Sequence, residues 1–159
     1  MKKGEIYEGI IEKVDFPNKG YVCIDDQKVL IKNGIPGQKV RFMIQKKRSG
    51  RAQGRILEVL EKSPFETRDA VCNNFPACGG CMYQTMSYEN QLVMKETQIR
   101  ELLEEALVRG GQVDKNGQAD FDWEGIHGSP IEFGYRNKME FSFGDEYKDG
   151  PLSLGLHKK

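Results

Sequence analysis

The sequence has no long apolar run, and that absence excludes a membrane-spanning protein. No stretch among its 159 residues is long and apolar enough to cross a bilayer. We also expect no secretory signal, because Lys2 and Lys3 are followed by Gly4 and Glu5 rather than by apolar residues. We therefore expect a cytoplasmic protein that has no membrane as a partner.

Histidine is scarce, and this limits the metal sites that the sequence can build. The two histidines, His127 and His157, lie far apart and do not form a paired ligand unit. The chain has four cysteines, which a cytosolic protein keeps reduced. Closely spaced cysteines in such a protein indicate metal or redox chemistry before they indicate disulfides.

Net charge is also absent, but the zero total hides two oppositely charged halves. The chain has 24 basic and 24 acidic residues. Residues 1–62 hold 14 Lys and Arg against 8 Asp and Glu, whereas residues 63–159 hold 10 against 16. This asymmetry predicts two modules, residues 1–62 and residues 63–159, and favours the first as a binder of nucleic acid.

Short strand-like runs separated by turn residues fill the first module. The five predicted strands are Glu5–Val14, Tyr21–Ile24, Val29–Ile31, Lys39–Gln45 and Arg51–Leu60. The breaks between them are rich in Gly, Pro, Asn and Asp. Closing a sheet on itself removes its exposed edges, so we expect a five-stranded antiparallel barrel of the OB type.

A basic cluster accompanies the last two predicted strands. Its members are Lys39, Arg41, Lys46, Lys47, Arg48, Arg51 and Arg55, and no acidic residue occurs among them in sequence. On two strands joined by a turn at Ser49-Gly50 they would form one positive ribbon, to which a phosphate backbone is attracted. The alternative is an ordinary solvated hairpin tip, but the lack of acids favours RNA binding.

Cys72, Cys78 and Cys81 give the spacing Cys-x5-Cys-x2-Cys, with two glycines inside the last pair. A Cys-x-x-Cys pair lets two thiolates converge on one metal, and glycine lets the backbone wrap closely around the sulfurs. Three clustered cysteines with a distant fourth are typical of a 4Fe-4S cluster. A zinc site completed by another ligand and three unligated core cysteines are the alternatives. Cys23, inside a predicted strand, is interpreted as a small buried apolar residue.

The second module is predicted to contain one long helix and a pair of strands. Ser87 is a suitable N-cap for a helix over about residues 88–109, and Gly110-Gly111 would end it. Seven residues recur at helical spacing and predict one apolar face: Tyr88, Leu92, Ile99, Leu102, Leu103, Ala106 and Leu107. Glu96 with Arg100 and Glu105 with Arg109 are expected ion pairs.

Residues 111–124 are polar and acidic and are expected to form a surface loop. The next predicted strand, Phe133–Phe143, would pair with Leu152–His157. Arg136 and Lys138 are two residues apart, so on a strand they would share one face. They would either form an ordinary solvated surface or contact RNA.

Several segments together resemble a known family. Gly34–Val40 resembles part of the TRAM domain, an OB-like RNA-binding barrel of RNA-modifying enzymes. Residues 78–84 with the cysteines, Ser87–Leu92 and the segment Tyr135-Arg136-Asn137-Lys138 resemble the RNA uracil-5-methyltransferases that carry an iron–sulfur cluster and act on 23S ribosomal RNA. The resemblance runs from the TRAM-like start to about Leu156.

The resemblance implies an α+β protein in which a TRAM barrel precedes an incomplete central domain with the cysteine cluster. Its members transfer a methyl group from S-adenosylmethionine to C5 of uracil, and they bind this donor in a carboxy-terminal domain. The fourth cluster cysteine lies beyond the Tyr-Arg-Asn-Lys segment. Because this chain has no glycine-rich strand–turn–helix unit, we assign it no catalytic residue and no donor site.

Two other classes fit parts of the pattern. A small RNA-binding protein stabilised by zinc, without enzymatic activity, would also combine a barrel with clustered cysteines. A radical S-adenosylmethionine methylthiotransferase would combine a TRAM domain with a cluster. That class uses Cys-x3-Cys-x2-Cys, and the gap of five here argues against it.

Overall fold

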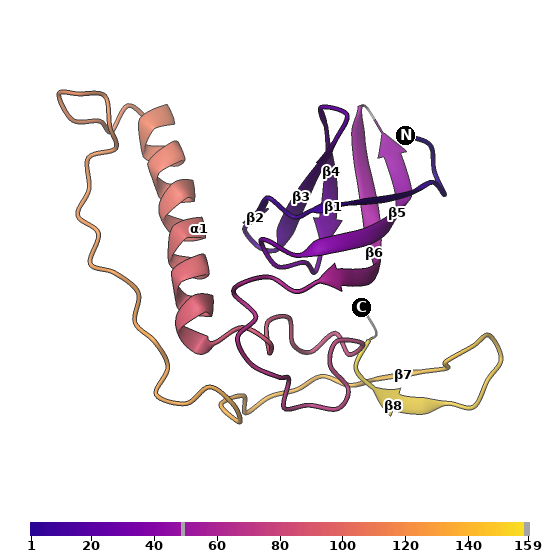
Figure 1. Cartoon of the computed structure of the whole chain (residues 1–159). Helices are drawn as coiled ribbons and strands as arrows, with labels where there is room; N and C mark the ends of the chain where they lie inside the picture. Colours follow the sequence, from indigo (N-terminus) through magenta and orange to yellow (C-terminus); the bar gives the residue numbers. More distant parts are fainter. Residues whose placement is uncertain (49, 158–159) are drawn as a thin grey trace.

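The computed structural model describes residues 1–48 and 50–157, which form a curled sheet, one long helix and a small separate hairpin (Figure 1). The elements are β1 (Ile6–Ile10), β2 (Lys13–Asp15), β3 (Lys19–Ile24), β4 (Gln27–Lys32), β5 (Lys39–Arg48), β6 (Arg51–Glu61), α1 (Tyr88–Arg109), β7 (Ser142–Gly144) and β8 (Ser153–Gly155). The predicted α+β class is confirmed. In the described part of the chain no helix combines the length and the apolarity needed to span a membrane.

The sheet has six strands in the order β1-β5-β6-β4-β3-β2, so the prediction of five strands was wrong in number. The predicted first strand bends at Ile11. There Ile11 N–H donates to Gln38 O at 2.9 Å, and Glu12 N–H donates to Tyr21 O at 3.0 Å. The chain thus changes hydrogen-bonding partners at the bend, and one predicted strand becomes β1 and β2, which form the two edges of the sheet.

One strand pair also differs from the purely antiparallel prediction. β4 and β6 run parallel, with Val29 opposite Ala52 and Ile31 opposite Gly54, while the other neighbouring pairs are antiparallel. Side chains alternate strictly along β5, where Val40, Phe42 and Ile44 are buried. Together with their neighbours they form a core cluster of Ile11, Val14, Val22, Val29, Ile31, Val40, Phe42, Ile44 and Ala52.

The ends of α1 agree with the prediction. Ser87 Oγ accepts a hydrogen bond from Asn90 N–H at 3.2 Å, which satisfies one of the free amides of the first turn. At the other end Gly110 N–H donates to Ala106 O at 2.9 Å. Gly111 follows with a φ of +76°, a conformation that glycine adopts at little cost.

The face that α1 turns toward the sheet carries polar residues, and the predicted apolar stripe lies elsewhere on the helix. Gln98 is buried, and its Nε2 donates to Val14 O at 2.6 Å. Beside it, Lys13 of β2 forms an ion pair with Glu101 at 2.7 Å. Ile99 and Leu103, by contrast, are more than one-third exposed. The helical periodicity located an apolar stripe, but the stripe does not face the barrel.

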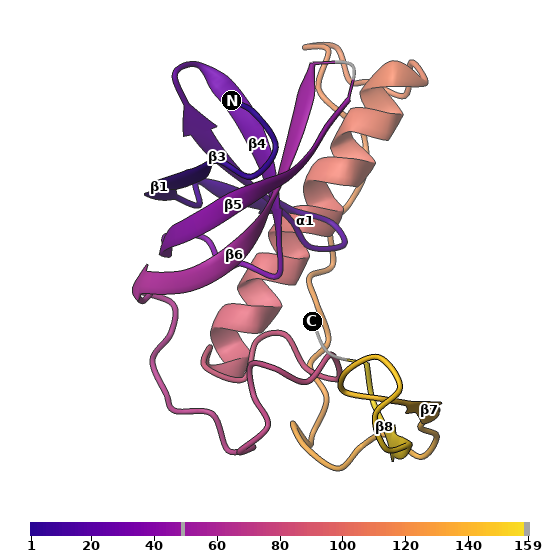
Figure 2. The same cartoon turned by 90° about the vertical axis from the view of Figure 1, so that its right-hand side faces the viewer.

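One of the two predicted ion pairs of α1 is confirmed. Glu105 pairs with Arg109 as expected. Arg100 pairs instead with Glu104, because the carboxylate of Glu96 accepts a hydrogen bond from the indole of Trp123 at 2.5 Å. The chain after the helix therefore runs back along it, as Figure 2 shows.

Residues after the helix contain little regular structure. The loop expected over residues 111–124 is confirmed, apart from an isolated bridge between Val113 and Ala119. The strand predicted for Phe133–Phe143 forms only as β7, which pairs with β8 in an antiparallel hairpin. The alternating pattern correctly predicted which two segments pair. Within the described chain, however, their pairing is limited to Ser142–Gly144 and Ser153–Gly155, near the hairpin turn.

Candidate RNA-binding surface and cysteine site

The basic cluster on β5 and β6 divides into two parts. At the base of the hairpin, Lys39 forms an ion pair with Glu61 at 2.9 Å. Arg41 binds both Glu8 of β1 and Glu58 of β6, at 2.8 and 2.7 Å. The sequence showed no acid between these cations, yet neighbouring strands supply three. The predicted positive surface is therefore neutralised at the base of the hairpin.

The other five cations lie on the half of the hairpin nearer its turn, and we call them the basic tip: Lys46, Lys47, Arg48, Arg51 and Arg55. All five are exposed, and none has an ion pair in the part of the chain that the structure describes. Arg48 lies directly opposite Arg51 in the register. Ser49, half of the predicted turn, lies outside the described residues. Lys47 Nζ also donates to Met1 O at 3.2 Å. Cations that form no ion pair within the described residues make this part of the hairpin a surface suited to phosphate.

The aromatic residues of the barrel do not accompany this tip. Phe42 is fully buried, and the Tyr7 ring stacks against it with centroids 6.2 Å apart. Tyr7 also donates its hydroxyl to Glu5, and Tyr21 is partly buried. Phe16 is half exposed, but it follows β2 rather than the β5–β6 hairpin. The tip thus offers charge without a stacking surface for bases.

Arg136 and Lys138 are both exposed but belong to no strand. Lys138 forms an ion pair with Glu140 at 2.8 Å, and both partners are largely in solvent. The expected strand that would align the two cations is not formed at these positions. The structure therefore does not place Arg136 and Lys138 on one face of a sheet, and it does not join them to the basic tip.

The three clustered cysteines lie on a loop between β6 and α1. Cys72 and Cys81 are exposed, Cys78 is partly buried, and all three are free thiols. Turn hydrogen bonds shape the loop, from Phe75 N–H to Cys72 O at 3.0 Å and from Cys78 N–H to Asn74 O at 2.9 Å. The segment that follows is packed more tightly, and burial raises the pKa of Tyr83 to about 12.

The donor set on this loop suits iron or zinc, although the side chains are not gathered. Gly80 N–H points at Cys78 Sγ at 3.4 Å, the kind of amide contact that tunes thiolate-bound metals. Among the residues described, no group of three or more His, Cys, Asp or Glu side chains is arranged to hold a metal ion. The chemistry of the ligands fits, and the loop would have to close to bring Cys72 and Cys81 together with Cys78.

Glycine is required between Cys78 and Cys81 by a close neighbour. Gly79 N–H donates to His157 O at 2.8 Å, and a Cβ at Gly79 would lie 2.5 Å from that oxygen. His157 also approaches Ser142 Oγ through its Nε2 at 3.2 Å. The backbone at His157 is thereby attached to the cysteine loop, a contact between segments that are 78 residues apart and that the sequence did not predict.

Polar side chains attach the cysteine segment to its surroundings, and no sequence pattern predicted these contacts. Gln84 is buried, and its Oε1 accepts a hydrogen bond from Cys72 N–H at 3.1 Å. Glu66 accepts from Gln38 of the barrel at 2.9 Å and from Thr85 at 2.8 Å. Glu66 is thus one of several side chains that link residues 1–62 with residues 63–159.

Cys23 departs from its predicted role as a buried apolar residue. It is exposed, and its Sγ donates to the Glu12 carboxylate at 3.6 Å. Alternation places Val22 in the core and the next side chain on the outside of the sheet. Partial desolvation and the Glu12 carboxylate raise the pKa of the Cys23 thiol.

Comparison with protein-family models finds no match. Over all of its 159 residues the chain is 45% identical to a protein from Clostridium tetani and 43% identical to one from Caldanaerobacter subterraneus. A protein from Bacillus cereus is 28% identical over the same length. All three are named as uncharacterized RNA methyltransferases, and the chain spans about a third of their lengths. All 159 residues of the chain are therefore homologous to a region of proteins named as RNA methyltransferases, and this region makes up about a third of the length of each such protein.

Proposed function

We propose that the chain is the RNA-recognition and cluster-binding part of an S-adenosylmethionine-dependent RNA uracil-C5 methyltransferase that acts on ribosomal RNA. The observation that carries the proposal is the similarity of all 159 residues of this chain to proteins named RNA methyltransferases. The cysteine spacing and the Tyr-Arg-Asn-Lys segment support the narrower assignment. Methyl transfer and donor binding would belong to the two thirds of such proteins outside the shared region.

The curled sheet would serve as a TRAM-like OB barrel. Its strand order supports this, because the bent first segment supplies both edge strands and β4 pairs in parallel with β6. The basic tip would hold the RNA backbone by charge, independently of base sequence. Arg136 and Lys138 would add contacts from the second module.

Cys72, Cys78 and Cys81 would provide three ligands of a 4Fe-4S cluster, and a cysteine outside these 159 residues would provide the fourth. When bound, the cluster supplies structural cross-linking of the loop, since the proposed methyl transfer needs no electron. The chain's own contribution is to hold the loop in place, through the Gln84 contact to Cys72 and through the Gly79 contact to His157.

An assay of methyl transfer tests the proposed function, and it uses the protein at the length that its gene encodes. We expect S-adenosylmethionine and ribosomal RNA to yield 5-methyluridine, identified by mass spectrometry of the digested RNA. Transcripts in which cytidine replaces the modified uridine serve as the control. Modification of another base or of protein alone would contradict the proposal.

The ultraviolet–visible spectrum and metal content of anaerobically purified protein test the cofactor. Absorption near about 400 nm, with iron and sulfide in cluster proportion, is the expected result for thiolate-ligated iron. Cys78→Ser should abolish it, whereas Cys23→Ser should leave it unchanged. One equivalent of zinc in a colourless protein would instead identify the zinc-stabilised RNA-binding class.

A further inference from the structure

Residues 133–143 carry the pattern of a strand that the described chain leaves mostly unpaired. Apart from Asn137, the odd positions are large and apolar: Phe133, Tyr135, Met139, Phe141 and Phe143. The even positions are small or charged: Gly134, Arg136, Lys138, Glu140 and Ser142. Such a period of two is the signature of a strand with one buried face. Regular pairing nevertheless begins only at Ser142.

The partner strand continues the same apolar face. Phe143 lies opposite Leu154 in the register, and alternation puts Leu152 and Leu156 on the side of Leu154. We call residues 133–143 with residues 152–156 the ribbon. Phe143 is 76% exposed and Leu154 is 59% exposed. Two short strands with an uncovered apolar face are marginal on their own in water.

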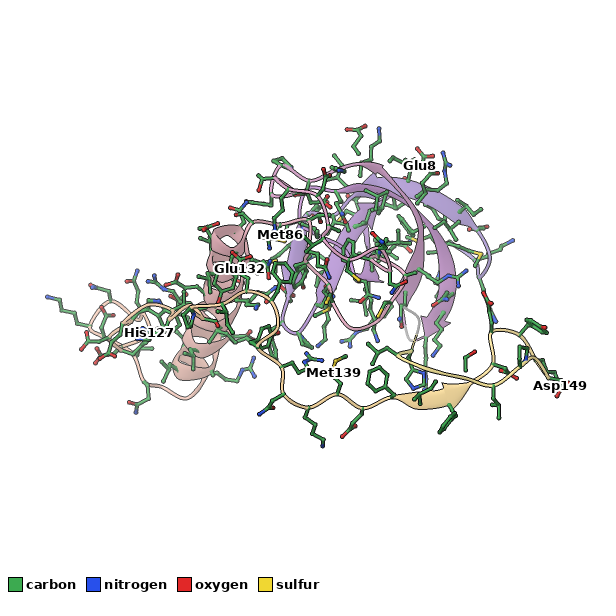
Figure 3. The ribbon with its side chains drawn as sticks, turned by 90° about the horizontal axis from the view of Figure 1, so that it is seen from below. Glu8, Met86, His127, Glu132, Met139 and Asp149 are labelled. Atoms are coloured by element: carbon green, nitrogen blue, oxygen red, sulfur yellow. The ribbon has the colours of Figure 1, made fainter. Side chains whose placement is uncertain are left out.

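The ribbon is nevertheless attached at both ends. At its start the Arg68 guanidinium lies 5.6 Å from the centre of the Phe133 ring and pairs with Glu132 at 2.6 Å. At its end Gly79 holds the carbonyl of His157. Figure 3 shows Glu132 and Met139 along this stretch, apart from the sheet. The uncovered face therefore belongs to a segment held against residues 63–86 rather than to a free tail.

We infer that the apolar face of the ribbon is a docking face for the part of the protein that its relatives have outside the shared third. On docking, residues 133–143 become one continuous strand. The buried core cluster of the sheet is drawn from residues 11–52 and includes no residue of the ribbon. About two thirds of each relative lies outside the region shared with this chain. A tethered segment meets the face at a high effective concentration, which favours it over a second copy.

This arrangement also orders the charged side of the ribbon. On a continuous strand Arg136, Lys138 and Glu140 share the face opposite the docked side. They would remain in solvent while the aromatic residues are covered. The inference rests on the proposed function only in that the chain is joined to the rest of such a protein.

Hydrogen exchange compares the ribbon in the protein at its gene-encoded length with the ribbon in the 159-residue chain. We expect the amides of residues 133–141 to exchange at least about tenfold more slowly in the longer protein, because strand pairing protects them. Equally fast exchange in both would overturn the inference. So would protection in the 159-residue chain that grows with its concentration, which would identify a second copy as the occupant.

Serine substitutions test the face itself in the longer protein. Met139→Ser and Phe141→Ser should lower Tm, while the matched substitution Glu140→Ser between them should not. Equal effects at odd and even positions would overturn the inference. Methyl transfer is a separate readout: a protein with a protected ribbon and no uracil methylation refutes the proposed function and supports docking.

Discussion

Cys23 places a thiol beside a carboxylate on the outside of the sheet. The Glu12 side chain that accepts its hydrogen bond belongs to the bend between β1 and β2. Burying part of the thiol's surroundings and placing a negative charge next to it both disfavour the thiolate, so the pKa is raised. A thiol in this setting is a poor nucleophile and a poor metal ligand, although it is exposed.

Neutralising Glu12 should therefore make Cys23 more reactive. Glu12→Gln removes the negative charge, lowers the pKa of the thiol and raises the thiolate fraction near neutral pH. We expect iodoacetamide to alkylate Cys23 faster than in the unchanged protein, because the thiolate is the reacting form. Mass spectrometry of the Cys23 peptide measures the rate, and Glu8→Gln, whose carboxylate binds Arg41, is the control. An unchanged rate in Glu12→Gln would show that the carboxylate does not set the pKa.

The β5–β6 hairpin is the element in which charge and position combine. Strand neighbours neutralise its base through Glu8, Glu58 and Glu61. Its tip lies beyond these acids and holds five cations that form no ion pair within residues 1–48 and 50–157. Because the described residues of β6 and of the outer half of β5 include no aromatic residue, the tip would bind RNA through phosphates and with a strong dependence on salt.

Reversing charges at the tip should weaken RNA binding. Arg48→Glu and Arg51→Glu are each expected to lower affinity roughly tenfold, because a phosphate contact is lost and a repulsion is added. The slope of log affinity against log salt should also become shallower by about one. Fluorescence anisotropy with labelled RNA at several salt concentrations measures both quantities. Lys115→Glu, a charge reversal at an exposed position in the loop after α1, is the matched control, and an effect as large there would refute a localised surface.

Across the whole molecule, local signals predicted elements better than contacts. Turn residues and alternation located the strands of the barrel, and Ser87 with Gly110-Gly111 located the helix ends, because these depend on nearby residues. The parallel pairing of β4 with β6 and the acids around Arg41 depend on tertiary contacts between distant segments. The sequence carried no pattern for them.

The candidate sites follow the same division. The spacing of Cys72, Cys78 and Cys81 was visible in sequence, whereas the side chain that holds Cys72 is a buried glutamine twelve residues away. Gln98 likewise reads as a surface residue of a helix, yet it is buried against Val14. Buried amides stabilise such contacts because an unpaired polar group in the interior is costly, and their partners are set by the fold.

The buried core residues of the sheet lie within residues 11–52, Met1, Tyr7 and Ile56 pack against them, and β6 ends at Glu61. During synthesis the amino-terminal part of a chain leaves the ribosome first. The barrel therefore has every residue of its core available before the cysteine loop, the helix or the ribbon has emerged. Folding in this order would give the later segments a finished surface on which to assemble, with Gln38 and the carbonyl of Val14 already in place for Glu66 and Gln98.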